Sequence, residues 1–236
     1  MGKVLFVMMW AICLVSNLCF ATFDVAADFS TTNNPNGVWS YGWSSTLISE
    51  FNMYLNHDKF SDTVPIDVWA GSNLLYSTPN VAHNGTGNPV TTHPTITWET
   101  GQFSLHPGEY GEYSHARWTA LEAGTFNITG EFMGIDILGT TTDVHVILHN
   151  VHVIPTNNFV LFEGSVNGYG TTLLFSNTVS VGIGDIIDFA VGYGYGDNPS
   201  HTCDTTALSV TIIPEPATLL LFTLGSFIFK RKNIKL

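Results

Sequence analysis

The feature that most constrains the fold is the period-two alternation of apolar and polar residues in the middle of the chain. Within 125–132, Phe126, Ile128 and Phe132 fall on one face of an extended strand. No convincing amphipathic helix is found, and Gly/Asn/Thr/Pro-rich loops separate the apolar stretches. Three further stretches have the composition or alternation of strands: 143–148, 186–191 and 207–213. Short strands with few helix formers favour an antiparallel β-sandwich.

A compact turn at Gly184-Asp185 stands between two apolar stretches within 181–189. We expect it to join two strands as a tight hairpin, of a kind that is frequent in jelly rolls. The predicted fold class is therefore all-β, an antiparallel and jelly-roll-like sandwich.

The N-terminus has the layout of a secretory signal peptide. Lys3 precedes an uncharged apolar stretch, 4–15, and small residues at Cys19 and Ala21 predict cleavage after Ala21. A lipoprotein signal is disfavoured, because Leu18 is not the small residue that must precede the lipidated cysteine. Removing residues 1–21 leaves Cys203 as the one cysteine of the mature chain, so no internal disulfide can form. The simplest interpretation of that thiol is a buried small residue.

The C-terminal stretch 214–236 has three parts in a fixed order. Pro214-Glu215-Pro216 comes first, an uninterrupted apolar run follows at 217–229, and a basic end occupies 230–236 with Lys230, Arg231 and Lys232. At about 1.5 Å per residue a helical run of this length reaches about 20 Å, short of the roughly 30 Å hydrocarbon core. We therefore expect a short transmembrane sorting tail with its cations on the cytoplasmic side. The alternative, a buried C-terminal helix, lacks an amphipathic period.

These three parts, in this order, resemble the PEP-CTERM protein-sorting signal of Gram-negative bacteria. The resemblance implies export and recognition of the tail by an exosortase, a membrane-embedded enzyme similar to cysteine proteases. It also implies an association with exopolysaccharide and the biofilm matrix. The segment 34–43, the Arg-Trp-Thr-Ala at 117–120 and the Gly-Asp-x-Ile-x-Phe at 184–189 resemble uncharacterised exported modules of such proteins.

Residues 22–213 form the predicted single domain, long enough for one sizeable core. This body holds eighteen of the nineteen acids but only two cations, Lys59 and Arg117, which gives a net charge near −16. Such a surface repels phosphates and anionic lipid, so nucleic acids are excluded as partners. It is compatible with divalent cations, neutral sugars or plain solubility outside the cell.

Three aromatic residues at alternate positions, Trp39, Tyr41 and Trp43, follow the turns at Asn34-Pro35 and Asn36-Gly37. Aromatic faces at period two could stack on successive pyranose rings. The alternative is that a first strand uses these rings to seal the core.

Arg117 and Trp118 form the second candidate for ligand binding. As one of two cations in an acidic body, Arg117 is expected to pair with a carboxylate near or inside the sandwich. The other interpretation is a ligand-binding arginine stacked on Trp118.

Histidines and glutamates offer weak signals for catalysis. On a strand His145 and His149 lie about 13 Å apart, while His152 points the other way, so we expect exposed residues and not a zinc site. Three glutamates could supply a glycosidase pair: Glu109, Glu112 and Glu122. No catalytic motif accompanies them.

Calcium is the one cofactor that the acids suggest. Asp28 near the first strand and Asp204 before the last would adjoin in a jelly roll, and the loop holding Asp197 could add oxygens. The alternative is that these aspartates form turns and caps.

The sequence thus predicts an exported, non-catalytic cell-surface or matrix protein that binds extracellular polysaccharide or packs against neighbours. It would be tethered to the membrane through its tail before processing. The alternative is a secreted glycan-active enzyme with an unrecognised carboxylate pair.

Overall fold

The computed structural model describes residues 22–61, 63–71, 78–92, 95–152, 157–194 and 201–215. Within these ranges the chain forms strands, turns and loops and no α-helix, which confirms the all-β prediction. The predicted signal peptide at 1–21, and the sorting tail from Pro216 onward, lie outside the described residues. In the part that is described, no helix has the length and apolar character needed to span a membrane.

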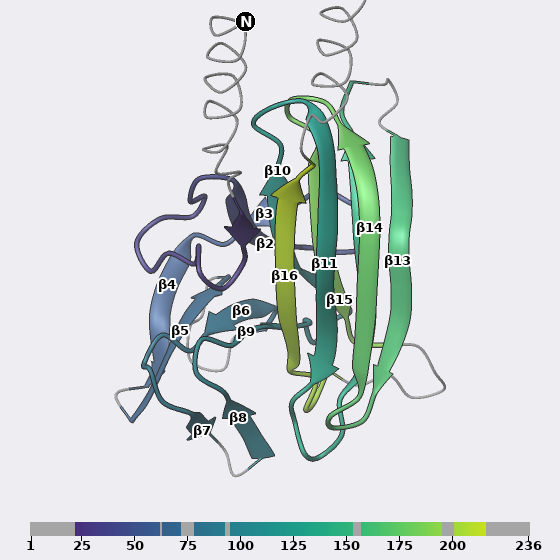
Figure 1. Ribbon diagram of the computed structural model, residues 1–236. Helices are drawn as coiled ribbons and strands as arrows, with labels where there is room; N and C mark the ends of the chain where they lie inside the picture. The colour runs from purple at the N-terminus through teal and green to yellow at the C-terminus, as the bar shows by residue number, and fades with distance from the viewer. Residues whose placement is uncertain are drawn as a thin grey trace, which may run out of the picture.

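Two antiparallel sheets account for most of the strands (Figure 1). The larger runs in the order β14-β11-β16-β9-β6-β5-β4, with β1 also paired to β16, and the smaller in the order β13-β12-β15-β10-β2-β3. The strands of the larger sheet are β1 (Phe23–Asp24), β4 (Asn56–Ser61), β5 (Val64–Ala70), β6 (Asn80–His83), β9 (Phe103–His106), β11 (Gly124–Gly134), β14 (Thr172–Val181) and β16 (Thr206–Pro214). Those of the smaller are β2 (Trp39–Ser44), β3 (Asn52–Met53), β10 (Tyr113–Thr119), β12 (Thr141–Asn150), β13 (Asn157–Asn167) and β15 (Ile186–Gly192). A separate ribbon pairs β7 (Val90–Thr92) with β8 (Ile96–Trp98).

The last eight strands form a jelly roll. Apart from the β12–β13 hairpin, consecutive strands alternate between the sheets, so that β9-β16-β11-β14 lie in one and β10-β15-β12-β13 in the other. This is the order of two Greek keys folded face to face, as the sequence predicted. The earlier strands extend the two sheets beyond β9 and β10.

The core lies between the two sheets and follows the period-two pattern. Phe126, Ile128 and Phe132 of β11 are buried, as are Val144 and Val146 of β12. Each strand turns one face toward the other sheet, so these alternating positions meet in a single apolar cluster.

The predicted hairpin at 181–189 is wrong. β14 ends at Val181 in the larger sheet and β15 begins at Ile186 in the smaller, so the turn crosses between sheets. The buried Asp185 carboxylate accepts hydrogen bonds from the Gly182 N–H (2.7 Å) and the Val151 N–H (3.0 Å). These bonds fix the turn against the end of β12, and Gly184 supplies the positive φ of 85° that it needs.

β16 runs through the middle of the larger sheet. Near its C-terminal end, Phe23 of β1 pairs with Ile212, so the first and last strands are adjacent. β11 flanks it from Pro214 back to Thr206, and β9 joins at its beginning. The described chain therefore enters and leaves at one end of the sandwich, while residues 201–205 lie at the other (Figure 1).

Candidate functional site

A cleft of about 510 Å³ lies at the end of the molecule where β16 begins. It is bounded by the β4–β5 turn, the start of β6, the β7–β8 ribbon, the end of β9 and the segment that precedes β16. Most of the lining residues are small or polar, and a few are apolar. The lining comprises Phe60, Ser61, Thr63, Val64, Thr78, Asn80, Thr92, Ile96, Trp98, His106, His201, Thr202, Cys203 and Thr205. Pockets for small ligands fall in this range of volume.

Two aromatic rings give the cleft a fixed apolar wall. The centroids of Phe60 and Trp98 lie 5.5 Å apart with their planes tilted by 41°. Trp98 is buried in a small second core and donates its indole N–H to the Ser104 hydroxyl at 2.8 Å. Phe60 is only partly buried. The pair can therefore offer a ring face to a ligand without rearranging.

His106 is the polar group whose chemistry the structure defines best. Its Nδ1 lies 2.8 Å from the Pro107 carbonyl oxygen, so Nδ1 carries the proton and donates. Burial of part of the ring lowers the pKa of His106 to about 4, so the imidazole is neutral at physiological pH. The remaining nitrogen, Nε2, is then a hydrogen-bond acceptor.

The described lining of the cleft carries no Asp, Glu, Lys or Arg side chain. Seven of its residues are Ser or Thr (Ser61, Thr63, Thr78, Thr92, Thr202 and Thr205) or the amide Asn80. The described lining therefore offers hydrogen-bonding groups and no charged partner for an ionic ligand.

Cys203 lies at the rim of the cleft, half-buried, in a left-handed backbone conformation with φ of 70°. Burial raises the pKa of its thiol, and the neighbouring carboxylates of Asp136 and Asp204 raise it further. The thiol therefore stays protonated and is a poor nucleophile. The expectation of a buried small residue is wrong, because the side chain lines an open cleft.

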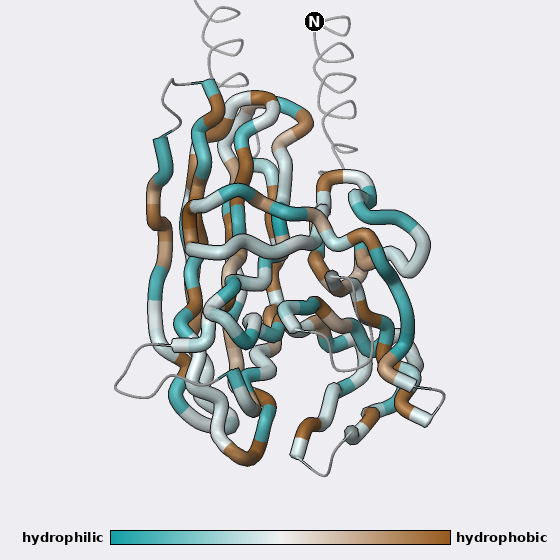
Figure 2. Tube along the Cα trace, turned by 180° about the vertical axis from the view of Figure 1, so that it is seen from behind, coloured by the Kyte–Doolittle hydropathy of each residue, from teal (hydrophilic) through white to brown (hydrophobic). Residues whose placement is uncertain are grey.

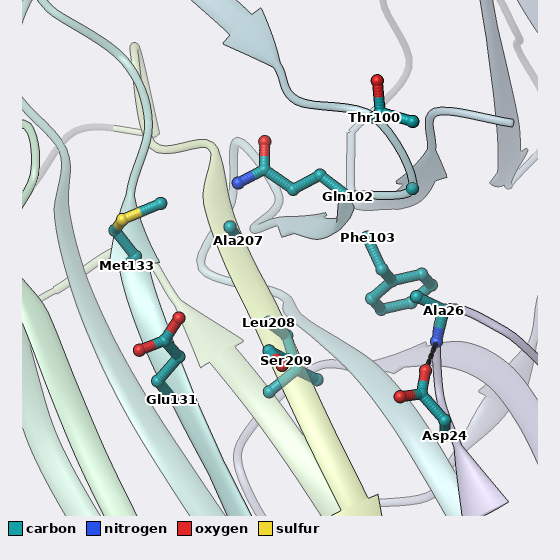
Figure 3. A pocket seen from close by; sticks show the side chains of 11 residues that line it. Asp24, Ala26, Thr100, Gln102, Phe103, Glu131, Met133, Ala207, Leu208 and Ser209 are labelled. Atoms are coloured by element: carbon teal, nitrogen blue, oxygen red, sulfur yellow. Dashed lines mark hydrogen bonds between the residues drawn. The ribbon is translucent and has the colours of Figure 1, made fainter. Parts of the chain in front are cut away.

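A second, smaller hollow of about 270 Å³ lies across β11 and β16 (Figure 3). In Figure 3 Asp24 and Glu131 lie on opposite sides of it, with Leu208 and Ser209 of β16 between them. The Asp24 carboxylate already accepts hydrogen bonds from the Ala26 and Ala27 N–H groups, both at 2.9 Å. This hollow has about half the volume of the cleft, so the cleft is the stronger candidate.

The three alternating aromatics of β2 belong mainly to the core. Trp39 and Tyr41 are fully buried between the sheets, and Trp43 is partly buried. The Trp39 indole donates to the Asp28 carboxylate at 3.1 Å. β2 lies between β10 and β3, and its inner face points at the opposite sheet, so neither buried ring is open to an external sugar.

Arg117 pairs with a buried carboxylate, as the sequence predicted. Its Nε and Nη2 both donate to Asp188 at 2.7 Å, and its guanidinium lies 3.8 Å from the centre of the Phe51 ring. Trp118 points to the opposite face of β10 and is buried beside Phe126, with centroids 5.1 Å apart. Arg117 therefore does not stack on Trp118, and neither residue lines the cleft.

Asp188 is the centre of a buried polar network on the outer face of the smaller sheet. His149 Nε2 lies 2.9 Å from its carboxylate. Burial alone would raise the pKa of Asp188, but the hydrogen bonds from Arg117 and His149 outweigh that effect and hold the pKa far below its usual range. His115 lies 3.7 Å from the same carboxylate, and its own pKa is lowered by burial to about 4. Sequence patterns missed Asp188, because no spacing along the chain relates it to Arg117.

Ser44, His115 and Asp188 stand in the order of a hydrolase triad, but their contacts oppose that role. The Ser44 hydroxyl donates its hydrogen bond to the Thr46 carbonyl at 2.8 Å, so in its 2.6 Å contact with His115 Nε2 it is the acceptor and not the donor that a nucleophile must be. All three members of the set are buried, and none lines either hollow. The arrangement is a structural network.

The other sequence-predicted groups are separated by the fold. His145 is buried and hydrogen-bonded to Asp143 at 2.8 Å, and His149 is largely buried against Asp188, so the expectation of exposed residues is wrong for both. It is right for His152, whose side chain is exposed. Glu112 precedes β10 and Glu122 follows it, about 20 Å away along a seven-residue strand, too far for a glycosidase pair. Glu109 shares the turn of Glu112, and neither of these two lines the cleft.

The two calcium candidates are not brought together. Asp28 lies beside Asp24, which pairs with Thr211, whereas Asp204 precedes the other end of β16, more than about 16 Å away. Asp197 lies outside the described residues. Within the described ranges, no three His, Cys, Asp or Glu side chains are placed to share a metal ion.

Comparison with known proteins yields no matching family model and no match among curated proteins. Three solved structures illustrate the weak structural likenesses. A family 4 carbohydrate-binding module has a TM-score of 0.32 at 17% identity, over 51% of this chain and 75% of its own. A family 61 carbohydrate-binding module in complex with β-1,4-galactotriose has 0.35 at 11%, over 59% and 90%. The K2 cleaved adhesin domain of Lys-gingipain has 0.39 at 10%, over 83% and 99%. All three TM-scores lie below 0.5, so these likenesses assign no role to the chain.

Proposed function

We propose that this chain is a non-catalytic, exported protein whose cleft binds an uncharged glycan. The observation that carries the proposal is the composition of the cleft. An aromatic wall, Phe60 and Trp98, faces a lining of hydroxyls, amide and neutral imidazole with no charged side chain among its described residues.

Each part of that lining matches a part of a sugar. The C–H face of a pyranose is apolar and stacks on an aromatic ring, while its hydroxyls need donors and acceptors around the rim. The serine and threonine hydroxyls supply both, and His106 Nε2 supplies an acceptor. An anionic glycan would find no arginine or lysine to pair with among these residues.

The cellular setting follows from the two ends of the sequence. The predicted signal peptide at 1–21 supports export, and the Pro-Glu-Pro, apolar and basic order of 214–236 supports sorting by an exosortase. The protein would then act at the cell envelope or surface, where extracellular polysaccharide is a candidate ligand.

The test is titration of the full-length chain, in mild detergent, against a panel of neutral oligosaccharides by calorimetry. Phe60→Ala removes the more accessible ring of the aromatic wall. Loss of a stacked ring is worth about 1.4 kcal/mol, so the Kd should rise about tenfold. The matched control is Phe159→Ala, an exposed phenylalanine on the edge strand β13, which should leave the Kd unchanged.

Two further readouts separate this proposal from its rivals. Binding of an uncharged ligand should keep the same Kd between low and high salt, whereas a charged ligand would weaken as salt screens it. Release of reducing sugar from a bound oligosaccharide would favour the secreted-enzyme alternative. The proposal fails if no neutral oligosaccharide binds, or if Phe60→Ala and Phe159→Ala behave alike.

A further inference from the structure

The chain is held to the sandwich almost up to the start of its apolar tail. Pro214 pairs with Phe126 of β11, and the Glu215 N–H donates to the Thr125 carbonyl oxygen at 2.8 Å. The apolar run begins at Ala217, two residues later. Two residues span at most about 7 Å, so whatever receives that run must lie close to the first residues of β11.

Exposed aliphatic side chains surround this point of departure. Leu121, in the loop before β11, is 67% exposed, Ile183 is 62% exposed and Val151 is 39% exposed. We call these three residues the apolar end. Figure 2 shows hydrophobic segments in the loops at this end of the sandwich.

Backbone contacts hold the apolar end together as one surface. The Gly184 N–H donates to the Ala120 carbonyl at 2.8 Å, and the Ala120 N–H donates to the Asp185 carbonyl at 2.9 Å. Asp185 also accepts from the Val151 N–H at 3.0 Å. The loop of Leu121, the turn of Ile183 and the end of β12 therefore cannot separate without breaking these bonds.

Exposure alone does not single out this end, because Leu138 is 68% exposed at the opposite end of β11. The exit of the chain does. A protein anchored through 217–229 has no spacer that could hold the apolar end away from the bilayer surface. Aliphatic side chains held at the bilayer surface are stabilised when they are buried at the boundary between headgroups and acyl chains.

We propose that the apolar end rests on a lipid surface, with Leu121, Val151 and Ile183 in contact with the interface. The proposal depends on the run 217–229 entering the bilayer and is independent of glycan binding. The lipid is zwitterionic, because the charged residues nearest this end are acidic: Glu122 and Glu215. The cleft, at the other end of β16, then faces away from the membrane.

A matched pair of leucines tests the proposal in the full-length chain. In a background with Cys13→Ser, Cys19→Ser and Cys203→Ser, an environment-sensitive fluorophore is attached to Leu121→Cys or to Leu138→Cys. The two positions are equally exposed and lie at opposite ends of β11. Each protein is reconstituted into phosphatidylcholine vesicles, with or without bromine on the acyl chains, and recovered by flotation.

The label at 121 should shift to the blue on reconstitution and lose at least half its emission in brominated vesicles. The label at 138 should do neither. Equal responses at the two positions would overturn the proposal. Failure of the full-length chain to float with vesicles would overturn it as well, by removing the anchored run on which it depends.

Discussion

Replacing Asp204 by asparagine should change the free energy of unfolding less at pH 8 than at pH 4. Asp204 is fully buried, and its Oδ1 accepts hydrogen bonds from the N–H (2.7 Å) and hydroxyl (3.1 Å) of Thr141. Its Oδ2 has no hydrogen-bond partner among the described residues. Burial raises the pKa of Asp204 to about 6, and the charges of Asp136 and Asp143 add to the effect, against the two bonds from Thr141.

The magnitude follows from the two pKa values. Asp204 takes up a proton near pH 6 when folded and near its ordinary value of 3.8 when unfolded. Between these values the folded state binds more protons, so stability rises as the pH falls from about 6 toward 3.8. The gain is about 3 kcal/mol at its limit, and it is lost again as the pH rises through 6.

Asp204→Asn keeps the Oδ1 acceptor and removes the titration. Its unpaired amide N–H₂ costs about 1–3 kcal/mol at every pH, similar to the cost of the buried charge that it replaces above pH 6. The variant should therefore match the parent within about 2 kcal/mol at pH 8. It should fall behind by about 2–3 kcal/mol more at pH 4.

The assay is urea unfolding of the full-length chain at pH 8 and pH 4, followed by tryptophan fluorescence. The comparison uses the difference in unfolding free energy between variant and parent, in which unrelated titrations cancel. Asp58→Asn, at an exposed position on β4, is the control and should give the same difference at both pH values. A pH-independent difference for Asp204→Asn would refute the reasoning.

Two more predictions concern the outer face of the smaller sheet. At Gly42 an added Cβ would collide with neighbouring backbone, so Gly42→Ala should cost about 2 kcal/mol or more in a thermal melt. Gly71→Ala, where the described residues place no atom within 4 Å of an added Cβ, should be nearly neutral. Arg117→Met strands the Asp188 carboxylate and should cost about 3–5 kcal/mol in urea unfolding. Lys59→Met, at the exposed second cation of the body, should stay within about 0.5 kcal/mol, and equal losses at the two cations would contradict the pairing argument.

The sequence predicts the jelly roll well because the period-two pattern is local. The buried face of β11 can be identified from the spacing of Phe126, Ile128 and Phe132 alone, without knowing which strand lies opposite. The crossing at Asp185 could not be predicted in this way. A Gly-Asp turn looks the same whether the next strand stays in its sheet or enters the other, and the choice depends on bonds to Val151, far away in sequence.

The cleft could not be predicted from the sequence for a related reason. Its lining comes from five separate segments, and a threonine or serine in any one of them is unremarkable. Phe60 and Trp98 become neighbours only when the β4–β5 pair and the β7–β8 ribbon fold together. By contrast, the partner of Arg117 could be predicted in kind, a carboxylate, because a buried cation in an acidic body must be neutralised.

The central place of β16 has a mechanical consequence. One end of this strand continues toward the tail, and the other follows directly from the cleft residues Cys203 and Thr205. A pull between a bound polymer and an anchored tail would therefore run along β16. The hydrogen bonds to β11 lie across the strand, from Thr206 to Pro214, so such a pull loads the ladder in shear and strains its bonds together. Tension that would unzip an edge strand bond by bond is here shared along the whole length of the strand.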